Sequence, residues 1–306
     1  MEKTFKSVDQ QAALLQQRGV QTNEQTKPIL MREGYYAVVN GYGKAFLDEA
    51  ASKQAGDDRY LPDTTFDQIY QLYLFDRKLR SITFNAIMSV ESTLRSIISY
   101  TFCEQHGKSG AYLLRGSYAQ EGEYLRGKDA YQEDLNDLLD TLERCARGFR
   151  PKRRDYNDYE NTRVTWYRDH YDNVPLWVLF SDLTFGNLRY FYALMKRNEQ
   201  QAVCNRLRES CGTTQQGQTL TPPGMLKDLS ALSSLRNSCA HNDRIYNGQF
   251  GNKHLSYAQI QQVLQAYLAQ EDEARFTSSV KELVKKHGKR DQKIMQILAE
   301  CGLEAD

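Results

Sequence analysis

The sequence predicts an all-α protein, and three observations support this fold class. Apolar residues recur at helical spacing in most segments, only six prolines interrupt the 306 residues, and no stretch indicates a sheet of consequence. An amphipathic helix buries its apolar stripe against other elements, and a chain of this length can build a sizeable core. No internal repeat is visible.

The first predicted helix runs from a Ser7 cap to Gly19 and is short and amphipathic. Its apolar face consists of Val8, Ala12 and Leu15. Glycines then interrupt the pattern among large aromatic residues over positions 34–43, which indicates a packed turn region. Residues 57–63 are polar, contain a proline and are expected to form a loop.

A long helix is predicted over residues 66–106, because this stretch contains neither glycine nor proline; two helices joined by a kink are the alternative. Thr64 and Asp67 have the spacing of a capping box at its start. Glu91 and Arg95 lie four positions apart beside the apolar stripe, where the simplest interpretation is a surface ion pair of about 0.3–0.5 kcal/mol. The stripe consists of Ile87, Val90, Leu94, Ile97 and Ile98.

Residues 107–174 form the least regular part of the chain, with scattered glycines and one helix predicted around residues 135–142. A basic run in this part consists of Lys152, Arg153 and Arg154 with their neighbours, and aromatic residues lie close in sequence. Such a segment can hold an RNA backbone while its rings stack on bases, or it can form a solvated loop. The sequence leaves both interpretations open.

Helical spacing returns after Pro175 in a strongly apolar stretch over residues 176–195, with a break or bend predicted at Gly186. A loop rich in glutamine and threonine, residues 212–223, separates this stretch from a helix that starts near Met225. Two or three further amphipathic helices are predicted over residues 257–268, 276–286 and 293–298.

Composition argues against several classes of protein. The net charge of +1 argues against a generic polyanion binder, so any nucleic-acid surface has to be local. No run approaches the roughly 18 apolar residues of a membrane span, and the N-terminus lacks the apolar core of a signal peptide. We therefore expect a cytoplasmic protein without membrane contact. The six cysteines include no C-x-x-C pair, so we expect reduced thiols, several of them in the core, and neither metal nor cofactor.

The most informative stretch is Leu235–Arg244, in which four residues separate Arg236 from His241 inside a predicted helix. On a helical wheel the apolar and polar residues of this helix fall on opposite faces, so the polar face points away from the core. The apolar stripe contains Leu232, Leu235 and Cys239, and the opposite face contains Ser234, Asn237 and His241. Arg236 lies between the faces, and its long stem can carry the guanidinium to the polar side.

An arginine beside a histidine suits metal-independent RNA cleavage, in which the 2′-hydroxyl of the RNA itself attacks the phosphorus. The Arg236 guanidinium can hold a phosphate with two hydrogen bonds, and a neutral His241 can transfer protons near pH 7. Spacing alone proves little, because Arg163 and His170 form a second, looser match in a segment of poor helical pattern. The alternative interpretation is a solvated helix face with a capping histidine.

Four stretches occur in order along the chain and span roughly residues 27–250. They are Glu33–Tyr36 through Gly41–Tyr42, Tyr73–Arg80 running to Val90–Arg95, Val174–Trp177 through Phe185–Leu188, and Leu235–Asn237 to Ala240–Asn242. Together these stretches resemble the Abi family of abortive-infection proteins, of the AbiD/AbiF type found in bacterial anti-phage systems. Each stretch alone is weak, whereas four in the same order are specific.

The resemblance implies the HEPN superfamily of all-α bundles, which typically dimerise and carry an R-x4-6-H ribonuclease motif with a polar residue after the arginine. It implies His241 as the proton-transfer residue, Arg236 as the stabiliser of the phosphate and transition state, and Asn237 as the orienting polar group. In this superfamily two motifs commonly meet across the dimer. A polar face directed away from the core agrees with that arrangement.

Glu91 and Arg95 also match the family pattern and are expected to support the site, whereas no family motif falls on residues 152–154. We expect a single domain over residues 1–306. Its expected parts are an N-terminal extension (1–63), a HEPN-like bundle (64–106 and 175–287), an irregular helical insertion (107–174) and a C-terminal helix (288–306).

The leading hypothesis is a cytoplasmic, homodimeric, metal-independent endoribonuclease that cuts RNA during phage infection. Attack by a 2′-hydroxyl would leave a 2′,3′-cyclic phosphate and a 5′-hydroxyl. One alternative is an RNA-binding protein that holds a small non-coding RNA without cleaving it. Another is a ribonuclease toxin that a protein antitoxin neutralises.

Overall fold

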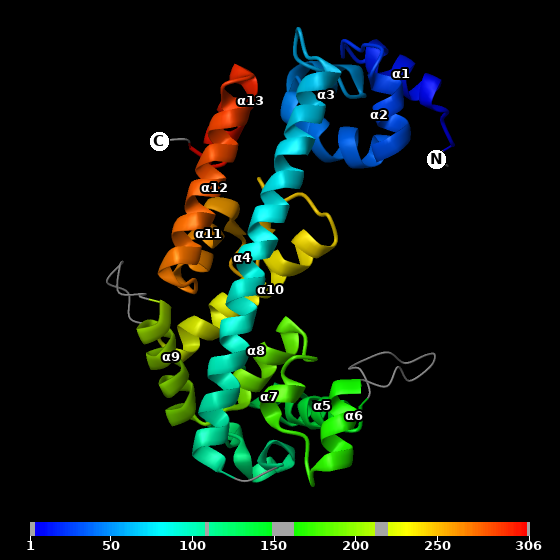
Figure 1. Cartoon of the computed structure of the whole chain (residues 1–306). Coiled ribbons are helices and arrows are strands. Elements are labelled where there is room, and N and C mark those ends of the chain that lie inside the picture. The colour runs from blue at the N-terminus through cyan, green and yellow to red at the C-terminus, as the bar shows by residue number, and fades with distance from the viewer. Residues whose placement is uncertain (1–3, 108–109, 149–161, 212–219, 305–306) are drawn as a thin grey trace. The chain divides into compact units, whose positions relative to one another are not determined.

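The computed structural model describes residues 4–107, 110–148, 162–211 and 220–304 (Figure 1). Helices account for nearly all of its regular structure, which confirms the predicted all-α class. The only sheet among these described residues pairs β1 (Gln249–Phe250) with β2 (Leu255–Ser256) in antiparallel register. The basic residues Lys152, Arg153 and Arg154 lie outside the described residues.

The chain forms two compact units, each assembled from segments that are distant in sequence. The first unit contains residues 1–83, 238–248 and 277–306, and the second contains residues 84–237 and 249–276. Three helices contribute residues to both units: α4 (Phe66–His106), α10 (Pro222–Ala240) and α12 (Gln270–Gly288). The organisation of the chain as one domain stays a prediction.

The remaining helices belong to one unit each. The first unit adds α1 (Val8–Gln17), α2 (Thr26–Glu33), the π-helix η1 (Tyr36–Asn40), the 3₁₀-helix η2 (Gly43–Phe46), α3 (Glu49–Ala55) and α13 (Gln292–Glu300). The second unit adds the 3₁₀-helices η3 (Ala111–Leu113), η4 (Arg115–Ser117) and η5 (Glu121–Glu123), and α5 (Lys128–Ala146), α6 (Thr162–His170), α7 (Leu176–Leu179), α8 (Phe185–Leu194), α9 (Arg197–Cys211) and α11 (Tyr257–Ala266).

Helix α1 starts as the sequence predicts and ends just before the predicted glycine. The Ser7 hydroxyl accepts a hydrogen bond from the backbone N–H of Gln10, and the Gln10 side chain accepts one from the backbone N–H of Ser7. Gly19 follows the helix with φ +95°, a conformation that favours glycine. Ala12 and Leu15 are buried, as the predicted apolar face requires.

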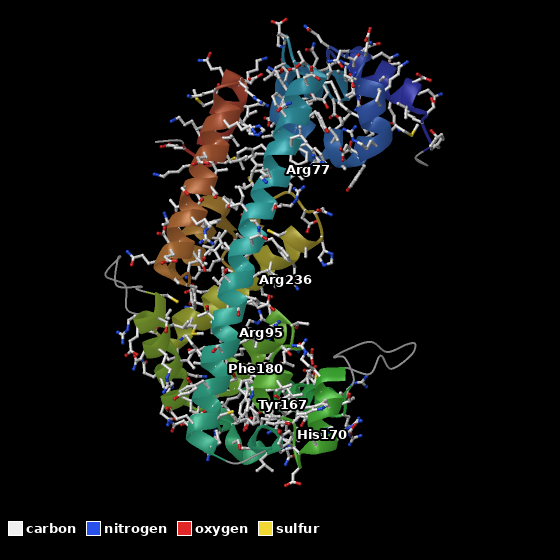
Figure 2. The ribbon with its side chains drawn as sticks, in the orientation of Figure 1. Arg77, Arg95, Tyr167, His170, Phe180 and Arg236 are labelled. Atoms are coloured by element: carbon white, nitrogen blue, oxygen red, sulfur yellow. The ribbon has the colours of Figure 1, made fainter. Side chains whose placement is uncertain are left out.

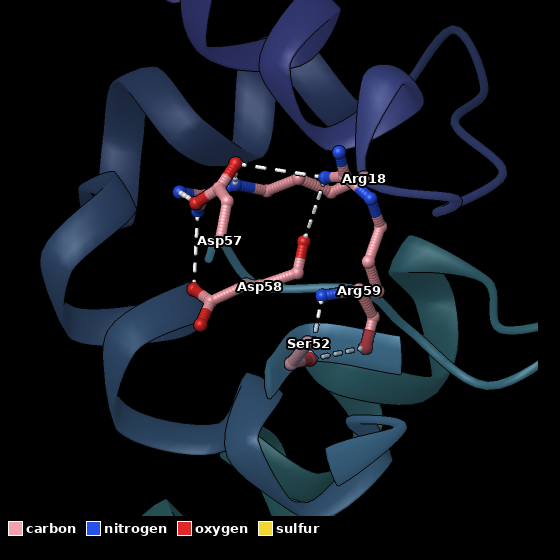
Figure 3. Close-up of polar contacts among 5 residues, drawn as sticks. All are labelled: Arg18, Ser52, Asp57, Asp58 and Arg59. Atoms are coloured by element: carbon pink, nitrogen blue, oxygen red, sulfur yellow. Dashed lines mark hydrogen bonds and ion pairs between the residues drawn. The ribbon is translucent and has the colours of Figure 1, made fainter. Parts of the chain in front are cut away.

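The loop after α3 is fixed by polar contacts within the first unit (Figure 3). Arg18, which follows α1, donates from Nε to Asp57 at 3.2 Å and from Nη1 to Asp58 at 3.2 Å. The Ser52 hydroxyl of α3 accepts from the backbone N–H of Arg59 at 2.8 Å and donates to the Arg59 carbonyl at 3.1 Å. The predicted polar loop is therefore confirmed, and it has defined partners at the end of α1 and on α3.

Helix α4 is one continuous helix of 41 residues, so of the two interpretations that the sequence leaves open the single long helix is the one observed. Its capping box lies one residue later than predicted. The Thr65 hydroxyl accepts from the N–H of Gln68 at 3.2 Å, and the Gln68 side chain accepts from the N–H of Thr65 at 3.0 Å. Thr64 instead donates its hydroxyl to the Leu61 carbonyl at 2.7 Å.

The apolar stripe of α4 is buried in both units. In the first unit it consists of Phe66, Ile69, Leu72, Phe75 and Leu79, and in the second of Ile87, Val90, Leu94, Ile98 and Phe102. Each such side chain contributes about 1.5–3 kcal/mol when it is removed from water. Ile97, which the wheel places in the stripe, is half-buried.

Several helices are not predicted from the sequence or begin at another residue than predicted. The predicted break at Gly186 lies over residues 180–184 instead, because Thr184 and Asn187 form a capping box that starts α8. Helix α6 forms in a segment of poor helical pattern, and the sequence analysis predicts no helix at α3 or α9. Helix α10 begins at Pro222, since proline has no N–H to lose in a first turn.

The cysteines are free thiols, as predicted, and four of them are buried. The buried four are Cys145, Cys204, Cys211 and Cys239. Burial raises the pKa of Cys145 and of Cys239 to about 12, so both thiols stay protonated and inert at neutral pH.

A buried histidine in the first unit makes its stability sensitive to pH. The ring of His287 packs edge-on against Phe75 with centroids 5.5 Å apart, and its Nδ1 atom has no hydrogen-bond partner among the described residues. Burial, together with the charges of Arg290 and Lys286, lowers the pKa of His287 below its ordinary value of 6.5. The folded chain therefore binds this proton less readily than the unfolded chain does.

We expect the contribution of His287 to the free energy of unfolding to be complete above pH 6.5 and to be lost as the pH falls below it. The unfolded chain then takes up a proton that the folded chain resists. In His287→Gln this part of the pH dependence disappears, whereas the exposed His170→Gln keeps it. Urea unfolding at about pH 7.5 and about pH 5.5 measures the difference. Equal pH dependence in all three proteins would contradict the role given to His287.

Candidate functional site

Helix α10 presents the two faces that the helical wheel predicts. The apolar residues Leu232, Leu235 and Cys239 are buried. On the other side Asn237 and His241 are exposed and Ser234 is half-buried. The burial pattern therefore confirms the two predicted faces for the helical residues of the motif, with Asn237 on the exposed side.

Arg236 is a half-buried residue in the part of α10 that belongs to the second unit (Figure 2). Its Nε atom is buried and has no hydrogen-bond partner among the described residues, and no carboxylate among them forms an ion pair with it. Because Nε is buried, an anion such as phosphate would reach the terminal nitrogens of this guanidinium. Asn237, the next residue, exposes its amide to solvent.

His241 lies one residue beyond the last helical residue, Ala240, which corrects the prediction of a helix through the motif. The backbone N–H of Asp243 donates to the carbonyl of Ser238 at 2.9 Å, and Asn242 between them has φ +59°. A hydrogen bond that spans six residues, together with a left-handed residue just before the donor, is typical of the Schellman motif that ends a helix. Asparagine can replace glycine at the left-handed position. His241 is thus an exposed C-cap residue held by a defined turn.

The chain after this turn is fixed by one buried carboxylate in the first unit. Asp76, on α4, is fully buried and accepts hydrogen bonds from the backbone N–H of Tyr246 at 2.8 Å and of Ile245 at 3.2 Å. It also accepts from the Tyr42 hydroxyl at 2.6 Å and pairs with the Arg80 guanidinium. Burial raises the pKa of Asp76, while the Arg80 charge and the three other donors oppose that shift.

Two arginines extend this network to neighbouring backbone. Arg80 donates to the Tyr42 hydroxyl at 3.0 Å and to the Asp243 carbonyl at 3.3 Å. Arg244 donates to the Gly41 carbonyl, and the rings of Tyr42 and Tyr246 stack with centroids 6.1 Å apart. The residues that follow His241 are therefore tied to residues 41–42 and to α4.

A second cluster in the first unit surrounds Glu33. The hydroxyl of Tyr73 donates to Glu33 at 3.0 Å, and Arg77 approaches the same carboxylate at 3.4 Å. Burial acts to raise the pKa of Glu33, but the hydrogen bonds from Arg32 and Tyr73 and the charge of Arg77 lower it overall. Tyr73 also packs edge-on against Tyr42 at 5.4 Å, so this cluster adjoins the Asp76 network.

Glu91 and Arg95 are brought together in the second unit. They form an ion pair, and Arg95 also donates to the carbonyl of Ser181 at 3.1 Å and of Leu183 at 2.7 Å. Glu91 is only 2% exposed, so this pair is not the exposed surface pair of the simplest interpretation. It connects α4 to the turn between α7 and α8. Its predicted support of Arg236 and His241 stays a prediction.

The second, looser arginine–histidine match lies on α6 and has local partners. His170 is exposed, its Nδ1 atom lies 2.7 Å from the Trp166 carbonyl, and its ring stacks on Trp166 at 4.6 Å. Arg163 is also exposed. Arg163 and His170 therefore form a matched comparison for the motif on α10.

The part of the chain that the structure describes contains neither a cluster of metal-ligand side chains nor a membrane-spanning helix. Among residues 4–107, 110–148, 162–211 and 220–304, no group of three or more His, Cys, Asp or Glu side chains could hold a metal ion. No helix in those ranges is both long enough and apolar enough to cross a bilayer. The basic residues 152–154 lie outside these ranges.

Sequence analysis missed the importance of Asp76, although a signal for it exists. Asp76 and Arg80 are spaced i, i+4 and alternate with the buried apolar residues Leu72, Phe75 and Leu79. Charged residues within an apolar stripe have to find partners, because an unpaired buried charge is costly. What the sequence cannot supply is the partner, since Ile245 and Tyr246 lie far away along the chain.

Comparison with known proteins gives one match. The model of a family described as Abi-like protein matches residues 28–247, which is more than half of the chain. The four stretches between Glu33 and Asn242 that resemble the Abi family, the family-like stretches, all fall inside that range. Neither a curated protein nor a solved structure matches the chain.

Asp76→Ala is expected to lower the free energy of unfolding by about 3–5 kcal/mol, because it leaves the Arg80 charge buried without a partner. Asp76→Asn should lose part of this amount, since it keeps one acceptor oxygen but places an NH₂ group among donors. The matched control is Glu143→Ala, which breaks an exposed i, i+4 pair with Arg147 and should cost less than about 0.5 kcal/mol. Chemical denaturation measures all three. Similar losses at Asp76 and Glu143 would contradict a central role for Asp76.

Asn242→Ala should lower the free energy of unfolding by up to about 1 kcal/mol, because asparagine tolerates the left-handed conformation at φ +59° better than alanine does. Asn242→Gly should match the wild type within a few tenths of a kcal/mol. Asn247→Ala, at an exposed position without positive φ, is the control. Thermal or urea unfolding distinguishes the variants, and an alanine as stable as the glycine at position 242 would contradict the turn described here.

Proposed function

The chain belongs to the family of Abi-like proteins, which implies abortive-infection defence against phage, and from this premise we propose that it is a metal-independent endoribonuclease. We assign it to the HEPN superfamily, with Arg236 and His241 as its R-x4-H motif. The proposed enzyme acts in the cytoplasm and cuts RNA during phage infection. Its products are a 2′,3′-cyclic phosphate and a 5′-hydroxyl.

One observation carries this proposal: the C-terminal end of α10 carries an arginine without an ion pair among the described residues, followed five positions later by an exposed histidine. Most other arginines of the family-like stretches have carboxylate or carbonyl partners, as Arg80 and Arg95 do. A side chain whose donors are not used by the fold is available for a ligand. RNA carries phosphate groups, and a guanidinium can bind a phosphate with two parallel hydrogen bonds.

The proposed reaction needs one proton removed and one proton supplied. His241 takes the proton from the 2′-hydroxyl as its oxygen attacks the phosphorus. The bond from phosphorus to the 5′-oxygen breaks, and that oxygen receives a proton as it leaves. Arg236 stabilises the charge that builds on the phosphoryl oxygens, and Asn237 orients the phosphate by hydrogen bonding.

A homodimer fits these two proton transfers. A single chain supplies one exposed His241, and one imidazole has to change its protonation state between the two steps. Two copies of the motif in one site would provide a base and an acid together.

The proposed role of Glu91 and Arg95 is to fix the second unit around Arg236. The proposed role of Lys152, Arg153 and Arg154 is to contact the RNA backbone.

Purified protein is expected to cut single-stranded RNA in the presence of a chelator. Arg236→Ala should reduce the rate about 100-fold or more, because it removes the charge that stabilises the transition state. His241→Ala should reduce it about 100- to 10,000-fold, because it removes the proton-transfer group. Arg163→Ala and His170→Ala, the matched pair on α6, should leave the rate unchanged. Gel electrophoresis of labelled RNA gives the rates, and mass spectrometry identifies the 2′,3′-cyclic phosphate.

The outcomes separate the proposal from its alternatives. Cleavage that requires Mg²⁺, or that survives both substitutions on α10, would exclude the proposed mechanism. Stable retention of intact RNA by a protein that never cuts it would indicate an RNA-binding role instead. Light scattering of the purified protein tests the dimer separately from the chemistry.

A further inference from the structure

A groove of about 860 Å³ opens on the second unit between the C-terminal part of α4 and the region of α7. Its lining residues lie on those two elements and on the turn that follows α7. They are Met88, Glu91, Ser92, Arg95, Ser96, Ser99, Tyr100, Cys103, Glu104, Trp177 and Ser181. The volume is in the range of sites that hold a small organic ligand.

Large apolar side chains on the rim of the groove are exposed. Tyr100 is 59% exposed, Trp177 is 61% exposed and Met88 is 43% exposed. Exposed aromatic rings that line a groove are suited to stacking against a planar ligand. The guanidinium of Arg206 lies 5.0 Å from the Tyr100 ring centroid and pairs with Glu104, so this side of the rim adds no net charge.

The polar side of the groove has no net charge, but some of its polar atoms have no hydrogen-bond partner among the described residues. The Glu91 and Arg95 charges cancel in their ion pair. The second carboxylate oxygen of Glu91, Oε2, has no hydrogen-bond partner among the described residues, and neither has the Nε atom of Arg95. Ser92 and Ser96, also on this wall, are exposed. The groove therefore offers the exposed hydroxyls of Ser92 and Ser96 close to aromatic rings, while the two unpartnered atoms of Glu91 and Arg95 are buried in its lining residues.

These features distinguish between possible occupants. A phosphate group is disfavoured, because Glu91 already neutralises Arg95 and would repel a second anion. An apolar helix from another chain is disfavoured, because it would cover the exposed side chains of Ser92 and Ser96 without giving their hydroxyls hydrogen bonds. A nucleobase has a neutral planar ring for Trp177 and Tyr100 and an edge of donors and acceptors for the polar wall.

We propose that this groove binds an unpaired nucleobase of RNA, stacked on Trp177 and Tyr100 with its polar edge toward Glu91 and Arg95. The inference takes its ligand class, RNA, from the proposed function and adds a second place of contact to it. It requires no cleavage. Binding at the groove and cutting at the motif can therefore be measured separately.

Tryptophan fluorescence provides a direct test, because the chain contains only two tryptophans, Trp166 and Trp177. The full chain carrying His241→Ala and Trp166→Phe leaves Trp177 as the only indole and leaves the RNA uncut. An unstructured single-stranded oligoribonucleotide should quench this fluorescence in a saturable manner. The same oligonucleotide with abasic positions should not, because it keeps the phosphates but lacks the rings.

Matched substitutions locate the binding. In the His241→Ala background, Trp177→Ala and Tyr100→Ala should each weaken RNA binding about tenfold, as expected for the loss of one stacking ring. Trp166→Ala and Tyr171→Ala remove rings of comparable exposure, 49% and 57%, that do not line the groove, and should leave the affinity unchanged. Fluorescence anisotropy of labelled RNA measures all four.

Three results would overturn the inference. Equal losses for Trp177→Ala and Trp166→Ala, or equal quenching by the abasic oligonucleotide, would show that no base is bound in the groove. A change in oligomeric state with Trp177→Ala, without a change in RNA affinity, would show that a second copy of the chain covers it. A protein that binds RNA through Trp177 but never cuts it would refute the proposed cleavage and leave this inference standing.

Discussion

The buried carboxylate of Asp76 is the constraint on which the first unit depends. Its donors come from three separate parts of the chain: the Tyr42 hydroxyl, the Arg80 guanidinium on the same helix, and the backbone N–H groups of Ile245 and Tyr246. An uncompensated charge in this position would cost several kcal/mol, a large part of the roughly 5–15 kcal/mol that keeps a protein folded. The three parts therefore have to assemble together. The turn that carries His241 is fixed as a consequence.

The second unit is stabilised by a similar ion pair, in which the guanidinium binds the distant backbone and the carboxylate compensates its charge. There the Arg95 guanidinium donates to two carbonyls of the turn between α7 and α8, and buried Glu91 compensates its charge. Backbone groups in a tight turn between helices have no helical partners, so a side chain has to satisfy them. Because Glu91 and Arg95 each keep one unpaired atom, this framework also provides the polar side of the groove next to Tyr100 and Trp177.

The family-like stretches therefore contain two kinds of polar residue. Asp76, Arg80 and Arg95 use their hydrogen-bonding groups inside the fold. Asn237 and His241 are exposed, and Arg236 has no carboxylate partner among the described residues. A sequence pattern treats both kinds alike, since each is a polar residue at a characteristic position. Burial and hydrogen-bond partners separate the residues that hold the chain together from those that remain available to a ligand.

The sequence by itself determined the features that depend on local periodicity. The all-α class, the single helix α4 and the two faces of α10 follow from apolar residues at helical spacing, which neighbouring residues alone define. Only the tertiary structure decided that α10 ends at Ala240 and that the chain then turns at Asn242, because Asp76 fixes Ile245 and Tyr246 from a distant helix. It also decided the short helices α3 and α6, whose patterns are too brief or too weak to stand without tertiary packing. Local patterns determine which face of a helix is buried. Long-range polar contacts determine where helices end and which charged side chains form pairs inside the fold.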